Sequence, residues 1–486
     1  MGTTISLNAI HDSIRSLSNE SREEILKLGQ TLTAAYAFDN FDVDLKPSVP
    51  TIEKSSDTLK HLTSGLLFLL SHIISPHDLR CSAELWKKSQ LNDESDNLPE
   101  DLAPLPDWQN LLRIHPKHSE LDSHGMSSRD RWNAWKFLHD LCHHGPEYFA
   151  QFRAILDEPE VIEEVPLVKT KLVPARAMDI NNGTVDGNRD AIQTLLAQGG
   201  IGDPNDAEEG GEEDVVNATE HVVLFHGDLG SGEKIHSAQL RRMLERMPHR
   251  RLQSSIFVFG LFHLKMACAD GIWRIFIKPK AARNDSTCIM RHVAFLRSRE
   301  MGTVISQPGF RRMHEIIMHD GICMRLECWR VLVNKKDERI LSLQAYAASG
   351  PTFSNLQVLA DILALEYVAR QPDLRELREK TAGQRDKQFE NGVIANQYFL
   401  LYEELSRAMD SGDIGRVELT FAPWAFIFKG TGKHKYAAQM FKHITDVHMF
   451  YPEGLKLAVR YSMLVNPSGK AGCFRATDWC VELANL

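Results

Sequence analysis

Three carboxylates on widely separated segments are the residues best suited to do chemistry. Asp39 lies in the apolar run AYAFDNF, Asp228 follows the run VVLFHG, and Glu482 lies near the C-terminal end of the sequence. Mg²⁺ prefers carboxylate oxygens and keeps water and substrate phosphate as its other ligands. Two such ions can activate an attacking oxygen and stabilise the leaving oxygen of a phosphodiester. The chain has 65 acidic residues, so spacing alone does not single out these three.

The segment 221–266 is expected to position Asp228. Short apolar runs at 222–225 and 255–260 are typical of buried strands, and the residues between them have helical spacing as far as Pro248. A strand, a helix and a second strand predict parallel pairing with a right-handed crossover. Chemistry collects at the carboxyl ends of such strands, which is where Asp228 and His263 lie.

The glycines after Asp228 are interpreted as part of a loop. Gly230 and Gly232 are expected to keep the stretch between the first strand and the helix flexible. The stretch GDLGSGE has glycines but lacks the Gly-Lys-Ser/Thr of a phosphate-binding loop and the spacing of a dinucleotide fingerprint. No GxSxG or HExxH motif occurs in the sequence.

Asp39 is expected on a strand near the N-terminus. Residues 5–36 have helical spacing, with Ser21 as a helix start. A period of two then runs to Leu45, and Pro47 and Pro50 end that strand. A second strand is expected at 66–70. An ionised carboxylate in a mainly apolar strand is costly unless it is paired or bound to metal.

The remaining segments are predicted as one α/β core interrupted by insertions. A strand is expected at 167–180 and a helix at 186–198, and Thr477 or Asp478 is expected to cap the last helix. Residues 93–107 and 206–214 are acidic and read as surface loops. The predicted segments are an N-terminal helical segment (1–35), the first strands (36–75), a helical and loop insertion (76–165), the rest of the α/β core (166–275), a mainly helical insertion (276–465) and a C-terminal return to the core (466–486).

Composition places the chain among soluble globular proteins. A net charge of −9 argues against a general polyanion binder, although a local basic face stays compatible with it. The eight cysteines include no CxxC pair, which favours free thiols in a reducing compartment. No signal peptide or membrane span is apparent. We therefore expect an intracellular protein without a membrane partner. The sequence contains no strong basic nuclear-localisation run, so whether the protein is nuclear stays open. Its oligomeric state stays open as well.

Two further groups of residues suggest binding. His143 and His144 follow Cys142 and would suit a metal, but more often such a run simply ends a helix. The segment 273–312 is basic, and clustered lysine and arginine are what phosphate contacts require. The alternative is a solvated helical surface with balancing acids nearby. The nucleic-acid-binding candidates are His263, Lys265, Lys278, Lys280, Arg283, Arg311 and Arg312.

Several stretches together resemble a fungal domain-of-unknown-function family, number 6589 in that series, whose members are often associated with mobile elements. The matching stretches are AYAFDNFDV, HLTSGLLF, VPARAMDINNGTVDGN, VVLFHGDLGSGE, FVFGLFHLKMACADGIWRIF, PGFRRMHEII, GDIGRVE, WAFIFKGTGKHKYAAQM and YSMLVNPSGKAGCFRATDWCVELAN. They run along most of the chain.

A looser resemblance bears on chemistry. The order of strand, Gly-Asp, helix, strand and Phe-His is similar to the middle of cut-and-paste transposases with a ribonuclease-H-like core. Those enzymes carry one acid on the first strand, one after a later strand, and a glutamate on a C-terminal helix, often after a large helical insertion. Asp39, Asp228 and Glu482 match those places in order. The resemblance implies a mixed-sheet core and Mg²⁺- or Mn²⁺-dependent phosphoryl transfer on DNA, with His263 contacting phosphate or orienting the site.

Some features depart from that pattern and leave alternatives open. No zinc-finger or helix-turn-helix module is evident. The sequence ends four residues after Glu482, which would fit a truncated copy. The third acid could therefore instead be Glu366, Glu404 or Glu418. Two hypotheses follow. One is a transposase-like nuclease or strand-transferase that uses two metal ions, and the other is a non-catalytic, element-derived protein that binds nucleic acid or protein.

Overall fold

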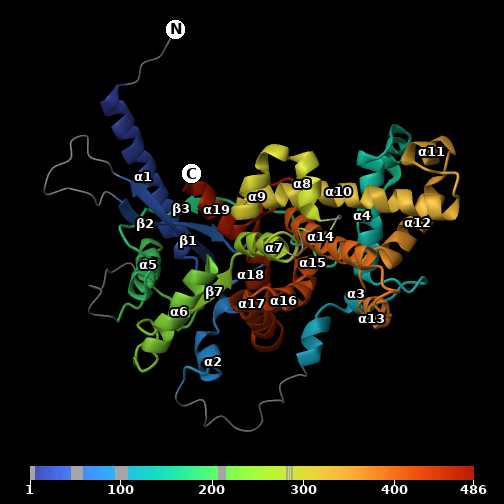
Figure 1. Ribbon diagram of the computed structural model, residues 1–486. Helices are drawn as coiled ribbons and strands as arrows, with labels where there is room; N and C mark the ends of the chain where they lie inside the picture. Colours follow the sequence, from blue (N-terminus) through green and yellow to red (C-terminus); the bar gives the residue numbers. More distant parts are fainter. Residues whose placement is uncertain are drawn as a thin grey trace.

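In this computed structural model a five-stranded mixed sheet lies toward the left of Figure 1, and most of the helices extend to its right. The structure describes residues 6–44, 59–92, 108–205, 215–280, 283, 285 and 288–485. The sheet has the strand order β3-β2-β1-β6-β7. Its strands are β1 (Ala34–Asp44), β2 (Leu59–Leu69), β3 (Leu172–Pro174), β6 (Val223–Gly227) and β7 (Ser255–Phe259). Four shorter strands pair outside it, β4 (Ile201–Gly202) with β5 (Val216–Asn217) and β8 (Leu464–Val465) with β9 (Arg475–Ala476).

Two pairing modes meet at β1. β1 and β2 pair antiparallel along their full lengths, with Asp39 opposite Ser64. On its other side β1 pairs in parallel with β6, with Tyr36 opposite Phe225. β6 and β7 are also parallel, as the pattern of strand, helix and strand predicted. The carboxyl ends of β1, β6 and β7 therefore point to the same edge of the sheet.

Helices cover both faces of the sheet. On one face, side chains of β1 and β6 pack against three helices, α1 (Leu7–Gly29), α5 (Val185–Gln198) and α6 (Leu229–Arg241). On the other face, Ala35, Ala37 and Leu224 join a larger core formed by α7 (Leu261–Phe276) and the C-terminal helices. Because successive residues of a strand point to opposite faces, β1 supplies Tyr36 and Phe38 to the first core and Ala35 and Ala37 to the second.

The C-terminal half is almost entirely helical and contributes to a third core. That core packs the tryptophans of α4 (Ser128–His144) and α10 (Gly309–Lys336) with α12 (Phe353–Glu366). The other helices are α2 (Ser82–Lys87), α3 (Pro116–Ser119), α8 (Ile289–Leu296), α9 (Met301–Ser306), α11 (Leu343–Ala348), α13 (Gln371–Glu379), α14 (Lys387–Ser411), α15 (Ile414–Leu419), α16 (Phe421–Gly430), α17 (His434–Thr445), α18 (Glu453–Ser462) and α19 (Thr477–Ala484). Short 3-10 turns are η1 (Pro76–Leu79), η3 (Trp108–Arg113), η4 (Glu147–Ile155) and η7 (Ser298–Glu300), and η8 (Asp446–Phe450) is a π-turn.

Several local predictions were wrong. The first helix begins after the cap Ser6 and not at Ser21, because the Ser6 side chain accepts from the Ala9 N–H. Residues 167–180 form a strand only at β3. Neither Thr477 nor Asp478 caps α19, whose N-cap is Ala476. Pro47, Pro50 and the acidic segments 93–107 and 206–214 lie outside the described residues. Among the residues described, no helix has both the length and the apolar character of a bilayer span.

A cluster of buried charged side chains joins α4 and α10 of the third core to α14. The Arg325 side chain of α10 is fully buried and lies 2.6 Å from Asp140 of α4 and 2.8 Å from Glu403 of α14. Lys136 lies 3.1 Å from Glu403 and also contacts Asp140. Burial alone would raise the pKa of Asp140, but Arg325, His139 and Lys136 hold it below its usual range. Three helices are thus joined through charges that have no access to water.

Replacing Arg325 should therefore destabilise the fold. Arg325→Ala leaves two buried carboxylates with only Lys136 in contact with both, and breaking a buried pair in this way costs about 3–5 kcal/mol. Arg330 lies on the same helix and pairs with Glu327 at the surface, so Arg330→Ala should cost only ~0–1 kcal/mol. Denaturant unfolding followed by circular dichroism measures both free energies. Equal losses in the two variants would show that the cluster does not stabilise the fold.

Candidate functional site

Asp39, in the middle of β1, lies beside the carboxyl end of β6, where Asp228 follows the strand. Each is three residues beyond the paired Tyr36 and Phe225, so the parallel register brings the two residues level. Adjacent strands are ~4.8 Å apart. By alternation Asp39 belongs to the same sheet face as Ala35 and Ala37, the face covered by α7 and the C-terminal helices. Two segments that are distant in sequence thus bring two carboxylates together.

Asp228 also begins helix α6. Its carboxylate accepts a hydrogen bond from the Ser231 N–H at 2.6 Å, which makes it the N-cap. Gly230 and Gly232 are accordingly helical and do not form the flexible loop that was predicted. Gly232 is required for packing, because a Cβ there would lie 2.2 Å from the Phe257 ring of β7. The glycines let α6 approach the sheet closely.

Asp478 fixes the C-terminal helix to this edge. Its side chain is 2% exposed and accepts hydrogen bonds from the Phe262 N–H at 3.1 Å and the His263 N–H at 3.0 Å, both in the first turn of α7. A Cβ at Gly260 would lie only 2.1 Å from this carboxylate, so glycine is needed where α19 meets α7. Because Asp478 and Glu482 are four residues apart on one helix, they share a face, and fixing the first orients the second.

The Glu482 carboxyl is close enough to Asp39 to perturb it. Burial, the charge of Glu482, a hydrogen bond with Glu482 and the charge of Asp228 raise the pKa of Asp39 to about 7, against the opposing Asn40 N–H. That N–H donates to the Asp39 carboxylate at 2.8 Å. The structure therefore gathers all three predicted carboxylates, Asp39, Asp228 and Glu482, in one locality.

His263 provides the positive charge at the site. Its Nδ1 lies 3.0 Å from Asp478 and its Nε2 lies 3.5 Å from Glu482. Burial alone would lower the pKa of His263, but the hydrogen bond and charge of Asp478, with the charges of Asp39 and Asp228, raise it to about 9. His263 is thus protonated at neutral pH and lies among four carboxylates.

The other candidates for the third acid are committed elsewhere. Glu404 is buried and pairs with Arg129 and Arg416. Glu418 is fully buried and contacts Arg460, which, with His115 and His448, holds its pKa well below the usual range despite burial. Glu366 is exposed and lies 3.4 Å from Lys335. These contacts are with cations of the helical region, whereas Glu482 faces Asp39 and His263.

The predicted basic residues differ in their surroundings. Arg311 contacts Glu315 and Arg312 contacts Glu300, so the balancing acids of the alternative interpretation are present. The guanidinium of Arg283 donates to two backbone carbonyls. Lys265 is half-buried, and burial lowers its pKa despite the nearby charge of Asp410. Lys278 and Lys280 are exposed, and the Lys278 ammonium lies 5.7 Å from the Trp273 ring centre.

No ready-made metal cage occurs in the described part of the chain, either at this site or away from it. Within it, no three His, Cys, Asp or Glu side chains are already gathered around one point, and this includes His143 and His144. His143 instead stacks on His139 with ring centres 4.0 Å apart. At the site, Asp228 is turned to the Ser231 N–H and Glu482 faces His263 and Asp39, so the carboxylates would have to rotate to share an ion. The ligand atoms at the site are carboxylate oxygens, which are the type that divalent cations prefer. Their negative charges also act on one another, since those of Glu482 and Asp228 help burial to raise the pKa of Asp39.

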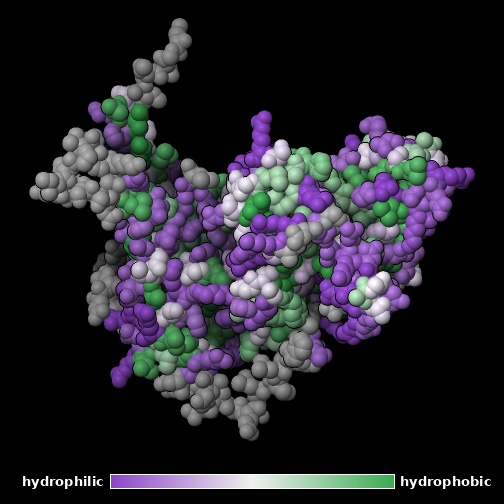
Figure 2. Space-filling model, in the orientation of Figure 1, coloured by the Kyte–Doolittle hydropathy of each residue, from purple (hydrophilic) through white to green (hydrophobic). Residues whose placement is uncertain are grey.

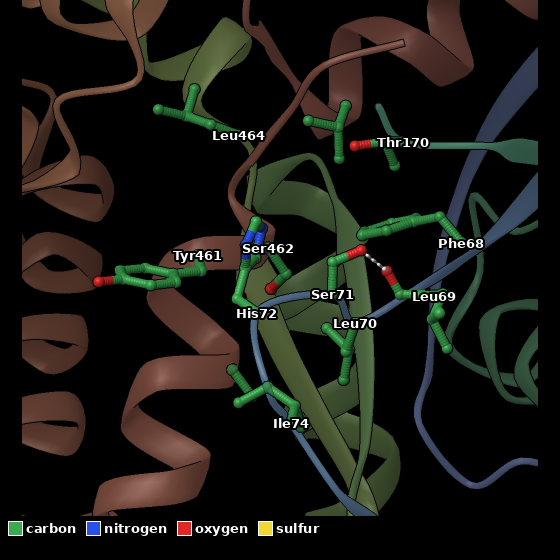
Figure 3. A pocket seen from close by; sticks show the side chains of 12 residues that line it. Phe68, Leu69, Leu70, Ser71, His72, Ile74, Thr170, Tyr461, Ser462 and Leu464 are labelled. Carbon is green, nitrogen blue, oxygen red and sulfur yellow. Dashed lines mark hydrogen bonds between the residues drawn. The ribbon is translucent and has the colours of Figure 1, made fainter. Parts of the chain in front are cut away.

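Two cavities of the described part of the chain are lined by other residues. A crevice of about 10 Å³, room for about one water, lies between the end of β2 and α18 (Figure 3). It adjoins Leu69, which pairs with Ala34 at the start of β1, five residues before Asp39. A larger cavity of about 210 Å³ is lined by α4, α14 and the segment 368–370. Neither is lined by Asp39, Asp228 or Glu482.

Comparison with known proteins gives one match. Residues 103–486 match a family described as a family of unknown function (DUF6589). The chain belongs to this family. The match includes Asp228, His263, Asp478 and Glu482, whereas Asp39 lies before it. No curated protein and no solved structure matches the chain. The family assignment agrees with the resemblance seen in the sequence and leaves the chemistry to be argued from the site.

Sequence reasoning missed Asp478. It was taken for a helix cap, although the spacing DxxxE in DWCVE places Asp478 and Glu482 on one helical face. That spacing was the available signal. Its partner Gly260, directly before Leu261-Phe262-His263, gave no hint, because only the packed structure shows the space that the carboxylate needs.

The raised pKa of His263 predicts a pH-dependent stability. A histidine whose folded pKa exceeds its unfolded value contributes stability that is fully present below about 6.5 and is lost as pH rises through about 9. His263→Gln should therefore destabilise the protein by roughly 2–3 kcal/mol at pH 6, and the difference from wild type should shrink by pH 9.5. Free energies of unfolding across this range measure it. The Asp478→Asn background should abolish most of the effect, and a loss that does not vary with pH would contradict the assignment.

Proposed function

We propose that this protein is a metal-dependent phosphoryl-transfer enzyme, a transposase-like nuclease or strand-transferase that acts on DNA phosphodiesters. The observation that carries the proposal is the meeting of Asp39, Asp228 and Glu482 at one edge of the sheet, where their charges act on one another. Several buried carboxylates in this chain contact arginine, as Glu404 and Glu403 do, whereas Asp320 pairs with His292. The cationic side chain at Asp39, Asp228 and Glu482 is that of His263. A carboxylate cluster with so little positive charge suits chemistry that requires a divalent ion.

The order of the parts along the chain supports a ribonuclease-H-like core. The first acid lies on the first strand, the second at the end of the later strand β6, and the third on the C-terminal helix α19. Between β7 and α19 lies the large helical region with its own core. This arrangement has the order of acids and the helical insertion of the transposases that the sequence resembles.

Each residue then has a defined task. Asp39, Asp228 and Glu482 would hold Mg²⁺ or Mn²⁺, which when bound would activate the attacking oxygen and stabilise the leaving oxygen of the phosphodiester. Asp478 holds His263 through Nδ1, so that Nε2 is left on the side of Glu482. Protonated His263 would donate a hydrogen bond from Nε2 to a phosphate oxygen. The half-buried setting of Asp39 would keep bulk water from its carboxylate.

A second function is a non-catalytic, element-derived protein that binds nucleic acid or protein. Two observations favour it. No described triad forms a preformed metal cage, and protonated His263 already offsets part of the negative charge. The arginines that would bind DNA nonspecifically are engaged with glutamates. Such a protein would keep the fold and the carboxylate cluster without turnover.

A nicking assay separates the two functions. Purified protein should convert supercoiled DNA to nicked or linear forms with Mg²⁺ or Mn²⁺, and chelation should stop the reaction. Asp39→Asn, Asp228→Asn and Glu482→Gln should each reduce the rate by ~100-fold or more, because several kcal/mol of transition-state stabilisation is lost. Asp42→Asn is the matched control, since Asp42 lies on the same strand, exposed and paired with His61, and it should retain wild-type activity. Activity that survives in Asp228→Asn, or absence of metal-dependent nicking, would refute the enzymatic proposal.

A further inference from the structure

We propose that the N-terminal half of α1 is a self-association site, at which two copies of this chain pair their first helices antiparallel. This proposal does not depend on the phosphoryl-transfer site, whose residues lie on β1, directly after β6 and on α19.

Among the residues that the structure describes, none buries this half of the helix. All residues from 6 to 20 are exposed, and the helix projects from the body before its C-terminal part reaches the sheet (Figure 1). Four large aliphatic residues are nonetheless exposed there: Leu7 at 74%, Ile10 at 42%, Ile14 at 57% and Leu17 at 65%. Figure 2 shows hydrophobic residues along the projecting segment. Isolated helices of this length are marginal in water, so a stripe of this kind indicates burial against another helix.

The spacing of the stripe indicates what covers it. The intervals of three, four and three residues are those of a two-helix seam. The order Leu, Ile, Ile, Leu is also symmetric about Asp12. In an antiparallel pair centred there, Leu7 lies opposite Leu17 of the second copy and Ile10 lies opposite Ile14. A twofold interface requires a surface that complements itself, and this stripe meets that requirement without any other protein.

Charge favours the antiparallel direction. The first turn of α1 contains no acidic residue, so its positive helix end is not offset from within the helix. The antiparallel arrangement brings Glu20 toward that helix end of the second copy. It also places the two bodies at opposite ends of the helix pair. A parallel pair would set like helix ends and both bodies side by side.

Sedimentation equilibrium of the full chain tests self-association. A seam of four residues per copy is small, so the dimer should be weak, with a Kd on the order of 10–100 µM. Ile14→Glu should raise that Kd at least ~10-fold, because it places a charge in the seam opposite Ile10. Asn19→Glu is the matched control: it adds the same charge on the opposite face of the helix and should leave the Kd within ~2-fold. Both variants should unfold at the wild-type temperature. A wild-type chain that stays monomeric up to ~1 mM, or equal effects of the two variants, would overturn the proposal.

Disulfide trapping tests the direction. A mixture of Leu7→Cys and Leu17→Cys chains should cross-link above the background of the wild-type chain, whose Cys323 is exposed. Leu7→Cys alone should stay at background, because the two introduced thiols would be ~15 Å apart along an antiparallel pair. Efficient cross-linking of Leu7→Cys alone would show a parallel pair and contradict the inference. A monomeric chain that sediments with anionic lipid vesicles would assign the stripe to a membrane surface instead, and would equally overturn it.

Discussion

The candidate site depends on one buried carboxylate, Asp478. It occupies the position of a cap for α7, although it comes from a helix more than two hundred residues later in the chain. The contact leaves space for no side chain at residue 260 and turns α19 so that Glu482 faces Asp39, in the middle of β1 beside the end of β6. Without this anchor, the register of β1 and β6 would still bring Asp39 and Asp228 together, but the third acid would have no fixed place.

The electrostatic consequence is a locally uncompensated negative charge. The chain pairs other buried carboxylates with single cations, as Arg325 does for Asp140, Arg460 for Glu418 and His292 for Asp320. At the sheet edge, four carboxylates meet one imidazole, and the result is a raised pKa for both Asp39 and His263. Such an arrangement costs folding free energy unless a proton or a cation offsets it. This is the physical reason for linking the cluster to function and not only to stability.

The parts that could be predicted from sequence were those encoded locally. Apolar runs predicted β1, β6 and β7, and the intervening helix predicted the parallel pairing of β6 with β7. The edge where Asp228 and His263 lie followed from that pairing. What could not be predicted depended on packing. Gly230 and Gly232 were predicted to be loop residues, but α6 begins directly after its cap Asp228 and includes both. The Phe257 ring leaves no space for a side chain at residue 232. Whether the basic segment was free or paired depended on where Glu300 and Glu315 lay in space.

The central claim is that Asp39, Asp228 and Glu482 share one cation site, and a Mn²⁺ titration followed by electron paramagnetic resonance tests it most directly. The account predicts saturable Mn²⁺ binding to the full chain at neutral pH. It also predicts that binding weakens by at least ~10-fold in each of Asp39→Asn, Asp228→Asn and Glu482→Gln and is unchanged in Glu404→Gln, if that variant folds, or in the exposed Glu366→Gln. No saturable binding, or binding that all three site variants retain, would contradict it.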